Sequence, residues 1–179
     1  LSEWETLLLA REHVLPVRLL DWSGNSLVAL YFACLFEREA EVDAALWALV
    51  RSNKKSLVNG TLVNVFEGTP PLDISGIRMI YPFNVSERLV VQAGAFTIQS
   101  NPRVGLEKQA QEDFKDQELD FVTLFKWRIP AVKRANIVFA LEELDINNRR
   151  LFPDLDGLAQ GLWHSEGLKN NRGQYNALS

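Results

Sequence analysis

The feature that most limits the possible folds is an uninterrupted apolar run of ten residues at positions 27–36. A helix needs about 20 apolar residues to cross a bilayer, so this run predicts a buried helix and not a membrane span. We expect the helix over residues 26–40, with Asp21 or Ser23 as its N-cap. Because the helix is apolar on nearly every side until Glu37, other elements must cover most of it.

The composition of the whole chain is that of one globular domain. Of its 179 residues 47% are apolar, and five Trp and ten Phe are among them. Burial of this much apolar surface can offset the entropy lost on folding, so extensive disorder is excluded. We expect one domain over residues 1–168 and a polar tail over 169–179. Since residue 1 is Leu and the first residues already resemble the middle of a helix, the natural start of the domain is expected to be missing.

Hydrophobic periodicity predicts helices at both ends of the chain and strands between them. A helix is expected over residues 2–13, where Ser2 and Glu5 have the spacing of a capping box. Later helices are predicted at 84–92 (capped by Ser86), 132–144 and 153–167, and strand-like runs at 17–22, 44–50, 61–66, 77–83, 95–99 and 124–129. Gly94 should break the chain between helix and strand, where a positive φ would make valine destabilising. The charged residues 101–120 are expected to form a solvated loop or a frayed helix.

Together these elements predict an α+β fold with one central, mostly antiparallel sheet flanked by helices.

Several common kinds of site are missing from the sequence. It contains no Gly-rich phosphate loop and no nucleophile elbow. His13 and His164 are far apart, and one cysteine cannot build a thiolate site, so no metal centre is expected. Cys34 lies inside the apolar run and is expected to be a buried core thiol, which is compatible with a reducing compartment.

Charge argues against nucleic acid as a partner. The formal net charge is -4, so no overall cationic field offsets the repulsion of phosphates. The main basic cluster is expected to be a solvated face; it consists of Lys126, Arg128, Lys133 and Arg134.

The most unusual segment is residues 15–23, which read Leu-Pro-Val-Arg-Leu-Leu-Asp-Trp-Ser. Arg18 and Asp21 lie in an otherwise apolar stretch, and ionised groups are rarely buried without partners, so we expect them to bond each other, a neighbouring backbone or a ligand. One interpretation is structural: the two side chains pair and hold the turn before the next helix. The other is functional: the segment forms an anion or ribose site at the N-terminus of that helix, where free N–H groups favour phosphate.

This segment, together with Leu-Val-Ala-Leu-Tyr-Phe-Ala at residues 27–33, resembles the signature of FRG domains. That signature has a form close to Gln-His-x-Gly-Leu-Pro-Thr-Arg-Leu-Leu-Asp-Trp-Thr, followed by Val-Ala-Leu-Tyr-Phe-Ala. Further similarity lies at residues 45–47, 81–82, 88–96 and 151–159, so the resemblance extends from about residue 1 to 163.

The chain departs from the FRG pattern at two places. Residues 11–14 read Arg-Glu-His-Val where the family has Gln-His-x-Gly, and Val17 stands in place of Thr. The Phe/Tyr-Arg-Gly motif that names the family is expected upstream of residue 1.

The order of the FRG motifs is also similar to that of ADP-ribosyltransferases of the Arg-Ser-Glu type. This likeness implies an ADP-ribosyltransferase-like fold and NAD as a substrate. Ser23 would support the nicotinamide-ribose pocket, Gln92 would stand where the catalytic Glu is expected, and Glu87 is the nearest carboxylate. The implied catalytic candidates are therefore Gln92 and Glu87, and the implied NAD-binding residues are Arg18, Asp21, Ser23 and Arg88.

Two functions follow from these resemblances. One is an NAD-using ADP-ribosyltransferase, such as a toxin or defence effector, in which a carboxylate stabilises the oxocarbenium-like centre. Gln92 could position the ribose but brings no negative charge to it. The other is a catalytically silent module that binds a nucleotide or a protein target. A cytoplasmic location is expected for either.

Overall fold

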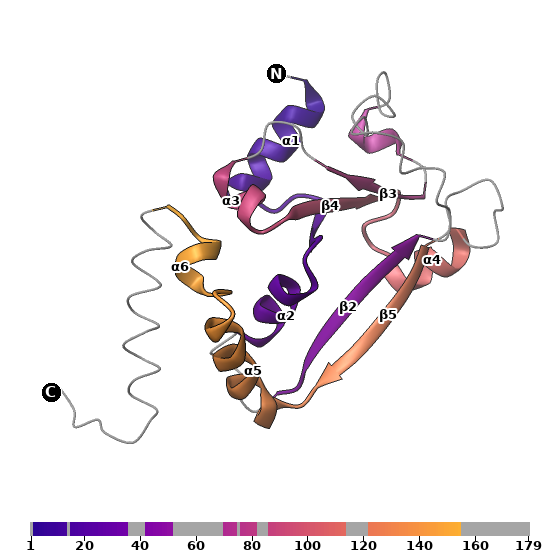
Figure 1. Cartoon of the computed structure of the whole chain (residues 1–179). Helices are drawn as coiled ribbons and strands as arrows, with labels where there is room; N and C mark the ends of the chain where they lie inside the picture. The colour runs from indigo at the N-terminus through magenta and orange to yellow at the C-terminus, as the bar shows by residue number, and fades with distance from the viewer. Residues whose placement is uncertain are drawn as a thin grey trace, which may run out of the picture.

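The computed structural model describes residues 2–13, 15–35, 42–51, 70–74, 76–81, 86–113 and 122–154. Its strands and helices confirm the α+β class (Figure 1). The elements are, in chain order, α1 (Glu3–Glu12), β1 (Leu19–Ser23), α2 (Ser26–Cys34), β2 (Ala44–Arg51), the 3-10 turn η3 (Pro71–Asp73), β3 (Ile77–Ile80), α3 (Glu87–Val91), β4 (Gly94–Gln99), α4 (Leu106–Asp113), β5 (Val122–Ile129), α5 (Ala131–Glu143) and α6 (Asn148–Leu151).

The described strands form two antiparallel sheets. One has three strands in the order β1-β4-β3, and the other is the two-stranded ribbon β2-β5. Leu19 pairs with Ile98 and Ser23 with Gly94 in the first sheet, whereas Ala44 pairs with Ile129 in the second. The prediction of one central sheet was therefore wrong, although the antiparallel pairing is confirmed.

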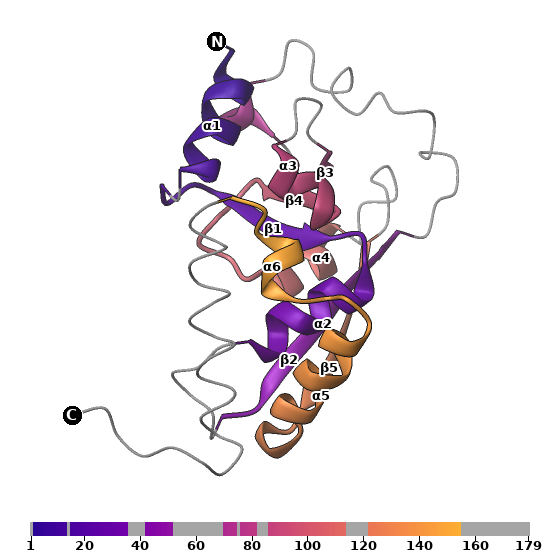
Figure 2. The same cartoon turned by 60° about the vertical axis from the view of Figure 1, so that its left-hand side comes forward.

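Each sheet packs against its own group of helices. A first core lies where α2 and α5 cover one end of the β2-β5 ribbon, and it contains Tyr31, Cys34 and Ile129 (Figures 1 and 2). A second core lies on one face of the three-stranded sheet, where side chains of α1 and Leu89 of α3 pack on Phe96 and Ile98. The burial of Cys34, which is 5% exposed, confirms the expected core thiol.

Most of the predicted helix starts are confirmed. Ser2 and Glu5 make both hydrogen bonds of a capping box at the start of α1, and the Ser86 side chain caps α3. The predicted cap of α2 was wrong: Asn25, and neither Asp21 nor Ser23, accepts from the Leu27 N–H, at 3.0 Å.

Two local expectations need correction. Gly94 does not have a positive φ; Ala93, one residue earlier, does, with φ 47°. The charged stretch 101–120 includes a regular helix, α4, which buries Gln109 and Ala110. The predicted strand at 61–66, most of the predicted helix at 153–167 and the tail at 169–179 lie outside the described residues.

Within the described part of the chain, no helix combines the length and apolar character needed to cross a membrane.

Candidate functional site

Arg18 lies just before β1 and bonds to backbone at the far end of the neighbouring strand. Its Nη2 donates to the carbonyl oxygen of Gln99 and, at 2.9 Å, to that of Ser100. These bonds join the beginning of β1 to the end of β4. The main role of Arg18 in this structure is therefore to donate hydrogen bonds that hold β1 and β4 together.

Asp21, in the middle of β1, is paired with α1. Arg11 donates from Nε to Asp21 Oδ1 at 3.1 Å and from Nη2 to Oδ2, which is a bidentate arrangement. The hydrogen bond to Asp21 raises the pKa of Arg11 above its ordinary value. The interpretation that Arg18 pairs with Asp21 was thus wrong, because each has a different partner. The alternative that a charged side chain bonds to neighbouring backbone is confirmed for Arg18.

Ser23 and Gln92 form a chain of hydrogen bonds across three elements. The Ser23 hydroxyl, at the end of β1, donates to the Gln92 carbonyl at 2.7 Å, just after α3. The Gln92 side chain then donates from Nε2 to the Leu151 carbonyl of α6 at 2.9 Å. The two predicted site residues are therefore brought together, and their bonds hold β1, α3 and α6 in place.

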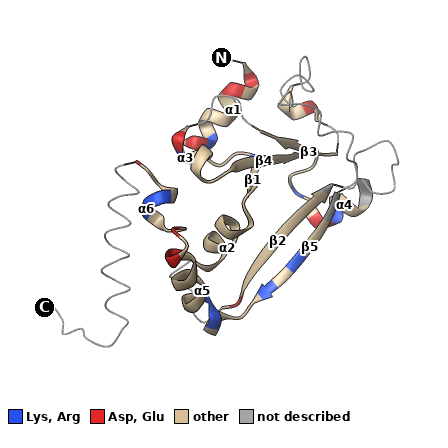
Figure 3. Ribbon diagram, viewed as in Figure 1, with Lys and Arg blue, Asp and Glu red and all other residues tan. Residues whose placement is uncertain are grey.

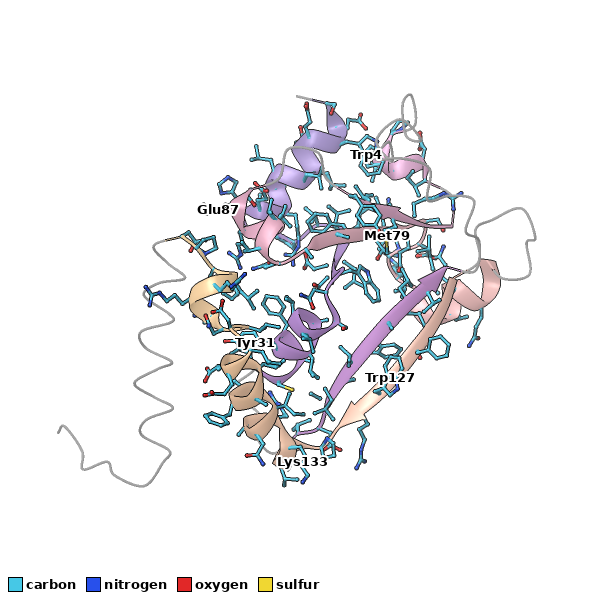
Figure 4. All side chains as sticks on the ribbon, in the orientation of Figure 1. Trp4, Tyr31, Met79, Glu87, Trp127 and Lys133 are labelled. Carbon is cyan, nitrogen blue, oxygen red and sulfur yellow. The ribbon has the colours of Figure 1, made fainter. Side chains whose placement is uncertain are left out.

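The exposed charged side chains of this region lie on α3. The guanidinium carbon of Arg88 lies 4.5 Å from the centroid of the Phe152 ring, which follows α6. Arg88 is exposed, and so is Glu87, which is labelled in Figure 4. Glu87 and Gln92 are five positions apart, which on a helix separates their directions by roughly 140°. The Glu87 carboxylate and the Gln92 amide therefore point in different directions and are not placed to contact the same atom of a ligand.

The six predicted site residues fall into three places. Ser23, Glu87, Arg88 and Gln92 gather at the end of β1, and with Phe152 they constitute what we call the α3 site. Arg18 lies at the opposite end of β1, about 17 Å away at the usual rise per strand residue. Asp21 lies between them and faces Arg11. A single cleft lined by all six residues is not what the described structure forms.

Two of the residues that make these contacts, Arg11 and Phe152, were not identified from the sequence. Arg11 stands in the segment where the chain departs from the FRG pattern, and that departure was its only signal. Phe152 belongs to a segment noted only for its similarity to a closing helix. In the described ranges no group of three or more His, Cys, Asp or Glu residues could hold a metal ion.

Comparison with known families supports part of the resemblance. The family model of the FRG domain matches residues 1–42. This match includes α1, β1 and α2, and hence Arg18, Asp21 and Ser23, but it ends before α3. No curated protein matches the chain, and no solved structure does.

Proposed function

We propose that this FRG-type chain is a nucleotide-binding module, with NAD as the candidate ligand, and that the α3 site binds the nucleotide without cleaving it. The observation that carries this proposal is the state of Gln92. Its amide is neutral and its Nε2 donates to the Leu151 carbonyl, at the position that the likeness to ADP-ribosyltransferases would assign to the catalytic Glu.

Arg88 supplies the recognition chemistry. An exposed guanidinium offers several N–H donors in a plane, which suits phosphate oxygens, and its flat face can stack on a base. Its contact with the Phe152 ring limits the orientations of the side chain. Arg149 of α6, which is also exposed, adds positive charge to an element that contacts α3 (Figure 3).

Ser23 and Gln92 serve as positioning residues in this proposal. Because they fix α3 against β1 and α6, they set where Arg88 lies relative to Phe152. Glu87, beside Arg88, is suited to accept from a ribose hydroxyl. An intracellular location, where NAD is available, is part of the same proposal.

The test is a calorimetric titration of the 179-residue chain with NAD, ADP-ribose and AMP, with nicotinamide release followed in the same samples. We expect binding without release, and a loss of affinity of about tenfold or more in Arg88→Ala. Arg103→Ala, which removes an exposed arginine elsewhere, is the matched control and should bind as the unmodified chain does.

Two results would overturn the proposal in different ways. No heat and no rise in melting temperature with any of the three ligands would exclude the nucleotide. Nicotinamide release that disappears in Glu87→Gln or Gln92→Ala would instead identify a transferase or NAD-cleaving enzyme.

A further inference from the structure

Strand β5 is exposed on both of its faces along its middle. The four consecutive residues from Phe125 to Arg128 are all exposed, whereas their direct partners on β2, Ala45 to Ala48, are all half-buried. Phe125 is 47% exposed, and Trp127, which is labelled in Figure 4, is 51% exposed. Exposed aromatic residues on one strand are costly unless something covers them, so this strand has the character of a binding surface.

The two faces of β5 differ in chemistry, since successive side chains of a strand alternate. On one face the rings of Phe125 and Trp127 stack with centroids 6.0 Å apart. On the other face are Lys126, with Nζ 4.6 Å from the Trp47 ring, and Arg128, with Nε 3.1 Å from Asp43. Both cations remain open to solvent, and they give β5 its band of positive charge (Figure 3).

The outer edge of β5 is the third observation. Among the described strands β5 pairs with β2 alone. The N–H and C=O groups on its other side therefore have no strand partner among the described residues. An edge of this kind can accept another strand through main-chain hydrogen bonds, with side chains of alternating type supplying specificity.

From these three observations we infer that the outer edge of β5 binds an extended segment of a partner protein in which acidic and apolar residues alternate. Added as a third strand, such a segment places its acidic side chains beside Lys126 and Arg128. The same register places its apolar side chains beside Phe125 and Trp127. The inference is independent of the nucleotide proposal, because β5 contributes no residue to the α3 site.

Two other occupants fit the surface less well. Single-stranded nucleic acid stacks its bases on exposed aromatic rings beside a basic track. Here the exposed rings of Phe125 and Trp127 lie on the face opposite Lys126 and Arg128, and the Trp47 ring next to Lys126 is half-buried. A second copy of β5 in an antiparallel pair would bring basic side chains next to each other in the registers that pair Lys126 with itself or with Arg128, which is destabilising. In no register would it bring an acidic side chain to this strand, because β5 contains none.

The experiment measures fluorescence anisotropy of labelled peptides of about ten residues, enough to span a strand. One peptide alternates Val and Glu, a second has the same composition in two blocks, and a third alternates Val and Lys. We expect only the alternating Val/Glu peptide to bind the unmodified chain. Its affinity should fall at least about tenfold in the double variant Lys126→Glu/Arg128→Glu, and also in Trp127→Thr.

The control is Arg103→Glu/Arg150→Glu, which makes the same change of charge at exposed positions in the loop after β4 and on α6, and should leave binding unchanged. Reversing the charge of the peptide guards against a variant that is merely misfolded: the Val/Lys peptide should bind Lys126→Glu/Arg128→Glu. Equal binding of the alternating and block peptides would overturn the inference, and so would failure of every peptide to bind. Binding of a labelled single-stranded oligonucleotide in preference to the Val/Glu peptide would overturn it in favour of nucleic acid.

Discussion

At the scale of single residues, the two charges of the 15–23 segment have different structural tasks. Asp21 holds α1 through Arg11 at a half-exposed position, with 52% of its side chain accessible. Arg18 instead donates to two backbone carbonyls at the end of β4. A charge that serves backbone carbonyls is hard to replace, because its loss leaves acceptors without a donor.

The first prediction compares these two residues. Arg18→Ala should lower the free energy of unfolding by about 2 kcal/mol, because it removes charged donors from two carbonyls. Asp21→Asn should lower it by less than about 1 kcal/mol, since exposed ion pairs contribute little. Urea unfolding followed by circular dichroism measures both. Equal losses in the two variants would contradict the assignment of Arg18 as the structural donor.

A second prediction concerns the turn between α3 and β4. Ala93 has the left-handed φ that favours glycine, so Ala93→Gly should stabilise the fold by roughly 0.5–1 kcal/mol. A Cβ on Gly94 would lie 2.5 Å from Leu89 Cδ2 and 3.4 Å from the Leu89 carbonyl oxygen. Gly94→Val should therefore destabilise by about 1–3 kcal/mol, through crowding of Leu89 and not through φ. If Ala93→Gly destabilises as much as Gly94→Val, the turn is not as described.

At the scale of elements, local signals in the sequence predicted what is local in the structure. The capping box of Ser2 and Glu5 and the cap at Ser86 were predicted because each acts within three residues along the chain. The strand at 44–50 was predicted because its apolar run has strand length and is bounded by charged residues. The cap of α2 was misassigned because Asp21 and Ser23 are also good caps, and the sequence does not show that β1 continues through Ser23.

A third prediction tests the observed cap. Asn25→Ala removes the acceptor of the Leu27 N–H and should lower the free energy of unfolding by about 1 kcal/mol. Ser26→Ala, at the next exposed position, should change it by less than about 0.5 kcal/mol. Both are measured by chemical denaturation. A larger loss in Ser26→Ala than in Asn25→Ala would identify a different cap.

At the scale of the whole molecule, the division into two sheets depends on contacts between distant parts of the chain. β1 pairs with β4 and β2 pairs with β5, and hydrophobic periodicity carries no information about which strands pair. The contacts of the α3 site could not be predicted from the sequence for the same reason. Gln92 bonds to Leu151, and Arg88 lies over Phe152, across a separation of about sixty positions.

Tyr31, which belongs to α2 and is 1% exposed, lies in the first core and connects α2 to α6. The backbone N–H of Asn148, at the start of α6, donates to its hydroxyl. Burial, and secondarily the negative charge of Glu142, raises the pKa of Tyr31 to about 12, and the hydrogen bond opposes this only in part. The Tyr31 phenol therefore stays neutral in the first core. It lies next to α6, whose Leu151 carbonyl accepts the hydrogen bond from the Gln92 side chain (Figure 4).

This arrangement predicts a loss of stability at high pH. The unfolded chain releases the Tyr31 proton near pH 10, but the folded chain retains it until about pH 12. Between these two values the unfolded chain is deprotonated and the folded chain is not, so rising pH favours the unfolded state. The stabilisation of the fold by Tyr31 is therefore complete below about pH 10 and is lost as pH rises to about 12. A shift of this size corresponds to about 2–3 kcal/mol.

Urea unfolding at a series of pH values should show this decline. Tyr31→Phe should be less stable at neutral pH, because the Asn148 N–H loses its acceptor, but its profile should be flatter over the same range. Tyr81→Phe, at a position that is 47% exposed, should keep the slope of the unmodified chain. If Tyr31→Phe loses stability just as steeply above pH 10, Tyr31 does not couple the helices α2 and α6 in the way inferred here.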